Sequence, residues 1–200
     1  AADGAAFGFP VPWSFTDRPR GIRGNSRSAR TEAEAVDRAV SDEVKNGILV
    51  DVSDAPELRT LELGMAALAA IPKKSGGTRI IVDHSRRRPD GTRRGLNGFL
   101  TETGEVVPMA RVRDAAMRIR DLREACGPIR AQVFDIASAY RQVPIDPRFW
   151  PLLAFEWRGR TLLDTRLAMG VAFAPGVMCR LSTAIAEAVE TRLAAADVPS

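Results

Sequence analysis

The sequence contains few of the residues that build histidine, thiol or membrane-spanning sites. It has one histidine, His84, and two cysteines, Cys126 and Cys179, among 200 residues. A single histidine excludes a histidine-rich metal site and argues against a Ser-His-Asp triad, and the two distant cysteines match no metal-ligand spacing. Disulfides are rare in reducing compartments, and two cysteines this far apart in the sequence do not indicate a disulfide framework. We therefore expect an intracellular, reducing location.

Long apolar runs are also missing. The longest extends from Gly64 to Pro72, far short of the roughly 20 residues that a membrane-spanning helix needs. We therefore expect no membrane span. The sequence begins with Ala1 rather than Met, so we expect a chain that is processed or cut from a longer one. Its opening residues form neither a signal peptide nor an Arg-rich presequence, and such a segment is one that processing removes.

Lysine is scarce, whereas arginine is abundant. Lysine occurs only at positions 45, 73 and 74, so all but three of the 29 basic residues are arginines. The pI is about 9.7. Arginine binds phosphate groups through a planar, two-pronged donor, and a basic balance fits a polyanionic partner. Arginines that are merely solvated on helix faces explain the composition equally well.

With 45% hydrophobic residues, the chain suffices for one domain or two small lobes.

The first 30 residues differ from the rest of the chain. They are rich in Gly, Pro and Arg, have no regular periodicity, and contain Phe7, Phe9, Trp13 and Phe15. This composition predicts an extended arm. The aromatic residues argue against plain disorder, so the arm either docks on a larger partner or packs on its own domain.

Three segments have helical periodicity. Thr31 to Lys45 predicts a helix that opens with a capping box of Thr31 and Glu34. Ile48 to Val50 then predicts a short strand. The other two helices are expected at Met109 to Ala125 and at Gly176 to about Ala196. In the first of these, we expect the apolar positions Val112, Ala116, Ile119 and Leu122 to face inward and Gly127 to end the helix.

Two segments are typical of β-hairpins. In Ile71 to Asp83, two apolar runs flank a cationic, glycine-containing tip, KKSGGTR. Such a tip suits a triphosphate or a nucleic-acid backbone, although hairpin tips are also where solvated lysines usually lie. A second hairpin is expected from Leu152 to Trp157 and from Thr161 to Thr165.

The segment most indicative of chemistry is Gln132 to Asp146, QVFDIASAYRQVPID. Val133 and Phe134 predict a buried strand that ends on Asp135. A carboxylate in that position can hold a divalent metal ion; an Asp that simply starts a turn is the plainer interpretation. A Gly/Ala-rich loop, Leu167 to Pro175, precedes the last helix.

In this order, the segments resemble the fingers and the N-terminal half of the palm of a reverse transcriptase, an RNA-directed DNA polymerase, of the Ty3-like or DIRS-like retroelement type. The resemblance covers roughly Ala35 to Ala196 and depends on four motifs, IPKK-G-x-R-x-x-x-D, D-x-x-x-A-Y-x-Q-x-P-I, LAFEW-G and L-x-x-G-x-x-x-A-P. It implies an α+β fold with an antiparallel palm sheet backed by two long helices. The expected parts are an arm at 1–30, fingers at 31–109 and a partial palm at 110–200.

The resemblance implies a role for the cationic hairpin and for the single acid. Lys73, Lys74 and Arg79 would contact the phosphates of the incoming nucleotide. Asp135 would be the first catalytic carboxylate and would coordinate Mg²⁺, together with the backbone carbonyl of Ile136.

The resemblance also implies a surface for the nucleotide and its template. Tyr140 would be the steric gate that excludes a ribose 2′-hydroxyl. Met169 and Gly170 would lie at the nucleotide, with Gly170 allowing a base pair to approach the backbone closely. The implied partners are RNA or an RNA/DNA duplex, and the 1–30 arm would bind other proteins of a larger assembly.

Several positions depart from the family pattern. Ser138 stands where the family usually has Asp, Ala168 where it has Pro, and Met169 where it has Gln or Phe. Two-metal polymerisation uses further carboxylates, which the family takes from a Tyr-x-Asp-Asp hairpin, and the sequence reaches Ser200 without that motif. We therefore expect this chain to be catalytically incomplete.

Three hypotheses follow from these matches and departures. The chain is part of a polymerase that continues beyond residue 200, located in the nucleus or cytoplasm. Alternatively, it is a retroelement-derived structural subunit of a larger assembly such as a mitochondrial ribonucleoprotein, located in an organelle. The third hypothesis is an unrelated α+β domain.

Overall fold

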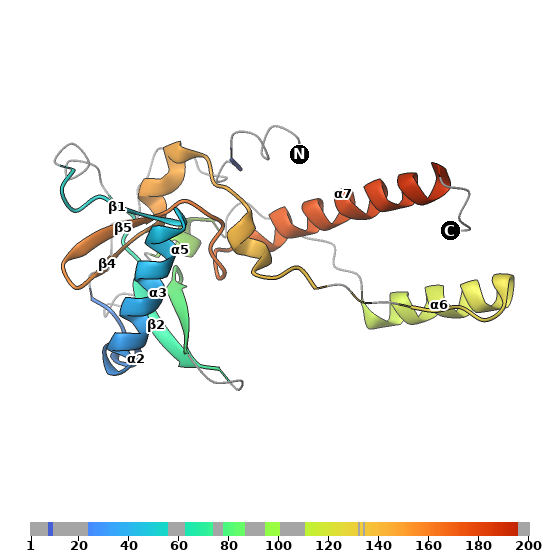
Figure 1. Ribbon diagram of the computed structural model, residues 1–200, viewed down its shortest axis with the longest axis horizontal. Helices are drawn as coiled ribbons and strands as arrows, with labels where there is room; N and C mark the ends of the chain where they lie inside the picture. Colours follow the sequence, from blue (N-terminus) through green and yellow to red (C-terminus); the bar gives the residue numbers. More distant parts are fainter. Residues whose placement is uncertain are drawn as a thin grey trace.

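The computed structural model describes residues 8–9, 24–55, 63–73, 78–86, 95–100, 111–131, 133 and 135–195. Helices and antiparallel strands alternate along this part of the chain (Figure 1). In chain order the elements are α2 (Arg27–Thr31), α3 (Ala33–Lys45), β1 (Leu49–Asp51), β2 (Ala67–Pro72), β3 (Thr78–Asp83), α5 (Leu96–Leu100), α6 (Val112–Cys126), the 3-10 helices η2 (Ala139–Gln142) and η3 (Pro147–Leu153), β4 (Ala154–Trp157), β5 (Arg160–Asp164) and α7 (Ala174–Ala195).

The described strands form two antiparallel sheets. One has three strands in the order β1-β5-β4, and the other is the β2-β3 hairpin. A bridge between Ala66 and Phe155 joins them, with the Ala66 N–H donating to the Ala154 carbonyl at 2.8 Å. The α+β class with antiparallel strands is therefore confirmed. Because β1 comes from the expected fingers and β5 from the expected palm, one sheet includes residues from both predicted parts.

Both predicted hairpins are present. In the first, β2 pairs with β3 from Ala67 opposite Asp83 to Pro72 opposite Thr78. In the second, β4 and β5 are joined by Arg158 and Gly159, both of which have positive φ. Positive φ at both central residues defines the two-residue turn whose twist matches that of the flanking strands.

Helix α3 covers the three-stranded sheet. Val36 and Val40, one helical turn apart, are buried in a cluster with Leu49 and Leu162. The Trp157 Nε1–H also donates to the Asp37 carboxylate at 2.8 Å. The predicted helix is confirmed, but the predicted capping box is not.

The predicted capping box of Thr31 and Glu34 is absent because a short helix, α2, directly precedes α3. Thr31 is the last residue of α2, whose first turn is capped by Ser26, and Glu32 precedes α3 without a side-chain capping bond. A residue already inside a helix cannot supply the extended backbone that an N-cap requires. Thr31 therefore does not cap α3.

The described parts of the N-terminal arm pack on the chain's own body. Phe9 is buried and pairs with Ile145, and the Phe9 N–H donates to the Pro144 carbonyl at 2.9 Å. The Ser26 N–H donates to the Leu68 carbonyl at 2.8 Å, beside β2. Of the two alternatives for the arm, packing on its own domain holds at these points, and the chain is helical rather than extended from Arg27.

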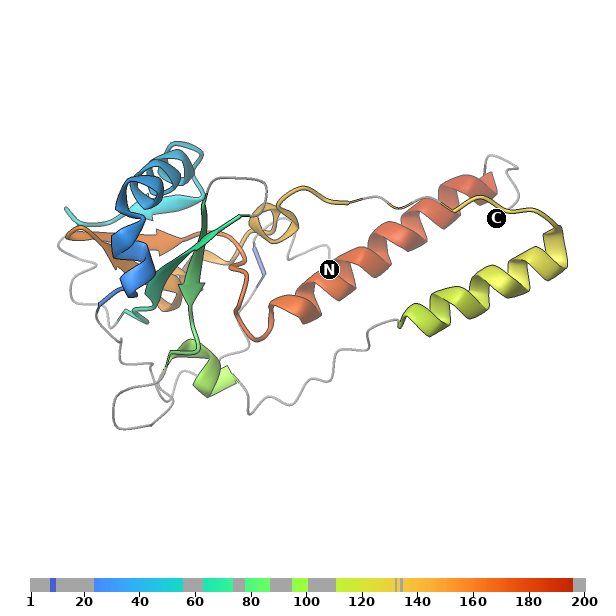
Figure 2. The same ribbon diagram turned by 90° about the horizontal axis from the view of Figure 1, so that it is seen from below.

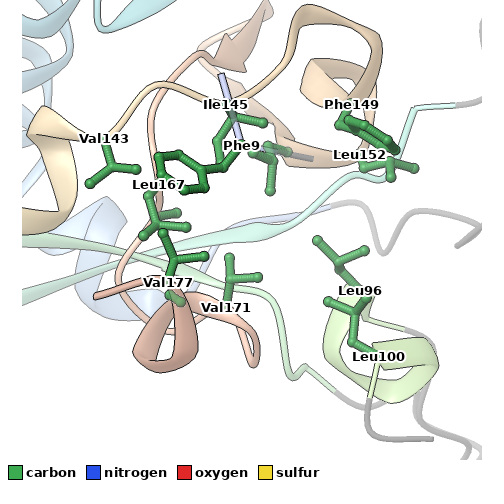
Figure 3. Close-up of a cluster of buried hydrophobic side chains, with 13 residues drawn as sticks. Phe9, Leu96, Leu100, Val143, Ile145, Phe149, Leu152, Leu167, Val171 and Val177 are labelled. Atoms are coloured by element: carbon green, nitrogen blue, oxygen red, sulfur yellow. The ribbon is translucent and has the colours of Figure 1, made fainter. Parts of the chain in front are cut away.

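A second hydrophobic cluster gathers segments from most of the sequence. Figure 3 shows Phe9 and Ile145 beside Leu167, Val171 and Val177, with Leu96 and Leu100 of α5 on the other side. The last helix, α7, is anchored here by Ala174 and Val177 in its first turn. This cluster therefore sets the position of the loop that precedes α7.

The helices α6 and α7 extend away from the body in both views (Figures 1 and 2). Both predicted helices are present, and α6 ends at Gly127 as expected. The predicted packing of α6 is wrong, however, because none of its residues is buried and Val112 is 88% exposed. Beyond its first turns α7 is exposed too, with Ile185 at 51%. Among the described residues, α3 rather than this pair of helices covers the sheet.

At its described residues, the expected strand before Asp135 is not formed. Val133 is 97% exposed, and neither Val133 nor Asp135 lies in a strand. A strand needs a neighbour to satisfy its backbone N–H and C=O groups, and none of the described strands pairs with this segment.

Among the described helices, none combines the length and apolar character that crossing a bilayer requires.

We predict that Phe155→Ala lowers the free energy of unfolding by about 3–5 kcal/mol, because the ring is buried in the cluster between α3 and the sheet. Chemical denaturation followed by circular dichroism measures this change. Ile185→Ala, on the exposed part of α7, serves as the control and should change stability by less than about 0.5 kcal/mol. Equal effects of the two variants would contradict the assignment of the core.

Candidate nucleotide and nucleic-acid site

Tyr140 lies in a short 3-10 helix that follows a sharp bend. Ser138 precedes η2 with left-handed backbone angles, φ 50° and ψ 39°, which mark a turn when the residue is not glycine. The Gln142 Nε2–H donates across the bend to the Ala137 carbonyl at 2.7 Å. Tyr140 is partly buried against the hydrophobic cluster that anchors α7. The bend therefore places the tyrosine between the chain leaving Asp135 and the start of α7.

The turn before α7 presents Met169 and Gly170 to solvent. Both are exposed, whereas the flanking Ala168 and Val171 are buried in the same cluster that Tyr140 contacts. Gly170 has φ 99°, a conformation that residues with a Cβ rarely adopt, and a Cβ built there would lie 3.8 Å from the Val82 carbonyl. The structure thus brings Tyr140 and both flanks of the Met169–Gly170 turn to one cluster, and the end of β3 lies beside Gly170.

The cationic residues lie at the far end of the β2-β3 hairpin. Arg79 is exposed and pairs with Ile71, two positions before Lys73, which is also exposed. Lys74 lies outside the described residues. Arg79 and Asp83 are four residues apart, so their side chains share one face of β3. At the rise of a β-strand this spacing separates them by about 13 Å. The hairpin therefore carries its cations away from the Met169–Gly170 turn.

Asp135 is exposed and precedes the bend, and the neighbouring Ile136 is exposed as well. Within the described part of the chain, no group of three or more acidic, histidine or cysteine side chains is arranged to hold a metal ion. The described residues therefore supply one carboxylate at this position and do not by themselves fit a two-metal centre.

An ion-pair bridge that the sequence analysis did not identify holds η2 in place. Arg141 donates to the Asp164 carboxylate at 2.5 Å and also pairs with Glu43 of α3. Asp164 is only 1% exposed and accepts a further bond from the Arg166 N–H at 3.0 Å. Arg141 therefore joins η2 to both α3 and β5. The sequence gives only a weak signal for this bridge. Asp164 is an acid at the end of the apolar run of β5, and it lies 23 residues from Arg141.

Burial and charge act in opposite directions on the pKa values of this bridge. It raises the pKa of Asp164 to about 6, although the Arg141 charge opposes the shift. Burial also lowers the pKa of Arg141, but the charges of Asp164 and Glu43 outweigh it and leave that pKa above its ordinary value. The arginine therefore remains charged, as a guanidinium with two carboxylate partners should.

His84, the single histidine, is buried next to this bridge. Burial, followed by the positive charge of Arg141, lowers its pKa from 6.5 to about 4. Neither ring nitrogen has a hydrogen-bond partner within the part of the chain that the structure describes. The side chain is therefore neutral at physiological pH.

Comparison with known proteins identifies the fold but no sequence family. No family model matches the chain, and no curated protein matches it in sequence. Among solved structures, the native prototype foamy virus protease-reverse transcriptase aligns with a TM-score of 0.53 and 18% identity, over 84% of this chain and 19% of that one. Its selenomethionine-labelled CSH mutant gives a TM-score of 0.52 and 19% identity, over 81% and 18% of the two chains.

A third structure, the foamy viral protease-reverse transcriptase in complex with double-stranded DNA, aligns with a TM-score of 0.50 and 18% identity, over 81% of this chain and 29% of that one. This chain therefore spans less than a third of the length of the proteins it resembles. At such low identity the similarity concerns the fold alone. The described residues have the fold of a fragment of a reverse transcriptase.

We predict that Arg141→Met lowers the free energy of unfolding by about 3 kcal/mol, because it leaves the Asp164 carboxylate buried without its cation. The double variant Arg141→Met/Asp164→Leu should recover much of this loss in chemical denaturation. Arg158→Met, which removes a largely exposed arginine paired with Asp37, is the control and should have little effect. A double variant no more stable than the single one would argue against the bridge.

We also predict a pH-dependent stability difference between the wild type and His84→Leu. Below pH 6.5 the unfolded chain binds a proton on His84, whereas the folded chain does so only near pH 4. Between about pH 7.5 and about pH 5, the wild type should therefore lose about 2 kcal/mol of stability relative to the variant. The opposite contribution of Asp164 is present in both proteins and cancels. A stability difference that stays constant with pH would contradict this prediction, because it would show that the folded chain protonates His84 as readily as the unfolded chain does.

Proposed function

We propose that this chain is a reverse-transcriptase-derived domain that binds RNA or an RNA/DNA duplex. The observation that carries the proposal is the packing of Tyr140 and of both flanks of the Met169–Gly170 turn on one cluster, with the end of β3 beside Gly170, within a fold like that of a reverse transcriptase. The complex of a foamy viral protease-reverse transcriptase with double-stranded DNA supports it, because that protein has a similar fold. The basic pI of about 9.7 favours a polyanionic partner.

Each predicted residue has a distinct role in this proposal. Arg79, Lys73 and Lys74 contact phosphate groups, for which the charge of all three suits them, as does the exposed position of Arg79 and Lys73 at the β2-β3 hairpin. Tyr140 lies against the sugar of the bound nucleotide, and the exposed Met169–Gly170 turn lies against its base pair. The parent family is proposed to be a retroelement reverse transcriptase of the Ty3-like or DIRS-like type, in which DNA synthesis depends on a template and a primer.

Magnesium is part of the proposal only at Asp135. Its carboxylate and the carbonyl oxygen of Ile136 are oxygen ligands of the kind that Mg²⁺ prefers. Because the described residues do not complete a metal centre, we assign no catalytic step to them. DNA synthesis by this fold would require carboxylates from elsewhere, and this chain is proposed to be catalytically incomplete without them.

A second candidate function is that of a structural subunit in a larger assembly such as a ribonucleoprotein. The exposed apolar side chains of α6 and α7, among them Val112 and Ile185, favour it, because apolar patches of this kind commonly mark contacts with other molecules. The native size of the protein and its intact mass, measured after one gentle purification, distinguish the two functions. A short chain inside a large particle would indicate the structural role.

We predict that Arg79→Ala weakens RNA binding at every sequence tested and lowers the slope of log affinity against log salt concentration by about 1, because one phosphate contact is lost. Fluorescence anisotropy with a labelled primer–template, repeated over a range of salt concentrations, measures both quantities.

Arg158→Ala is the matched control for this measurement. It also removes an exposed arginine, but one on the turn between β4 and β5 that is paired with Asp37 at 2.9 Å. It should leave the salt slope unchanged. If both variants lower the slope equally, binding follows the overall charge of the protein, and the proposed contact by the β2-β3 hairpin is wrong.

A further inference from the structure

Asn97 connects three segments that are far apart in the sequence. It lies in α5, is only 9% exposed, and uses both ends of its side-chain amide. Its Nδ2 group donates to the Ser85 Oγ and to the Gly170 carbonyl, each at 2.7 Å. Its Oδ1 atom accepts from the Ala172 N–H at 2.8 Å. A single side chain therefore joins the end of β3 to the turn before α7.

The partners determine the orientation of the amide. The Gly170 carbonyl can only accept and the Ala172 N–H can only donate, so rotating the amide by 180° would break both bonds. The backbone also contributes, because the Asn97 N–H donates to the His84 carbonyl at 3.1 Å. No other amide orientation satisfies this buried site.

The network continues into β3. The Asp83 carboxylate accepts from the Ser85 N–H at 2.9 Å, which shapes the bend that presents the Ser85 hydroxyl to Asn97. On the other side, Asn97 bonds to the turn at two backbone groups. These are the carbonyl of Gly170, which has φ 99°, and the N–H of Ala172. A turn held at two backbone groups on either side of Val171 has little freedom to reorient.

From this geometry we infer that Asn97 is a positioning residue, which holds the Met169–Gly170 turn against the end of β3 in the orientation that nucleic-acid binding requires. The inference rests on the proposed function, in which the turn contacts the base pair of the bound nucleotide. Asn97 itself is buried and does not contact the ligand. Its effect on binding is exerted entirely through the backbone of residues 170 and 172.

The first test measures amide hydrogen exchange at Ala172, whose N–H is bonded to Asn97. In Asn97→Ala we expect exchange there to be about tenfold faster or more, because the acceptor is removed. Val36→Ala, which destabilises the separate cluster under α3, is the control for general loss of stability and should not produce this local change. Equal exchange in the wild type and Asn97→Ala would overturn the inference.

The second test measures the affinity for a labelled RNA primer–template. Asn97→Ala and the isosteric Asn97→Asp should both weaken it about tenfold, since both lose the donor to the Gly170 carbonyl and only the first creates a cavity. Asn46→Ala, which removes an exposed amide at the end of α3, should bind like the wild type. Faster exchange without any loss of affinity would overturn the role in binding.

The two measurements separate this inference from the proposed function. A wild-type protein that does not bind the primer–template would show that the proposed function is wrong. The exchange rate at Ala172 would still decide whether Asn97 holds the turn in place.

Discussion

The ion-pair bridge of Glu43, Arg141 and the buried Asp164 is the constraint on which the central part of the structure depends. Burying an isolated charge is costly, so the buried Asp164 carboxylate is tolerated only while Arg141 remains beside it. Arg141 belongs to η2, Glu43 to α3 and Asp164 to β5. The bridge therefore sets where η2 lies on the body, and with it where Tyr140 meets the cluster that anchors α7. Hydrophobic contacts alone, which have no preferred direction, would not impose this orientation.

The hydrophobic cluster sets where the loops of the candidate site lie, and polar side chains fix how these loops are oriented. Arg141 orients the bend after Asp135, and Asn97 orients the Met169–Gly170 turn. Both act across long distances in sequence, and both are buried or partly buried. The part of the molecule beyond this body is different, because α6 and most of α7 expose their apolar residues. The fold thus combines a packed body with two helices that extend from it and expose apolar side chains.

Elements with a local signal were predicted well. The β2-β3 hairpin follows from two apolar runs around a glycine-containing tip, the β4-β5 hairpin from Arg158 and Gly159, and α3 from its helical stripe. Predictions that required a partner were less successful. An apolar, β-prone Val133 was expected in a buried strand and is exposed, because no described strand lies beside it. The inward face of α6 was wrong for the same reason: amphipathic spacing shows that a helix has an apolar face but does not show what covers it.

The sequence by itself determined the α+β class, the two hairpins and the candidate residues Tyr140, Met169, Gly170 and Arg79, because these depend on local pattern and on motifs in a fixed order. Only the tertiary structure decided that Tyr140 and both flanks of the Met169–Gly170 turn pack on one cluster, with the end of β3 beside Gly170. It alone identified Arg141 with Asp164, and Asn97 with Gly170, as the pairs that hold them there. Hydrogen bonds and ion pairs between residues 23 or 73 positions apart leave no periodic trace in a sequence, since their geometry exists only once the chain has folded.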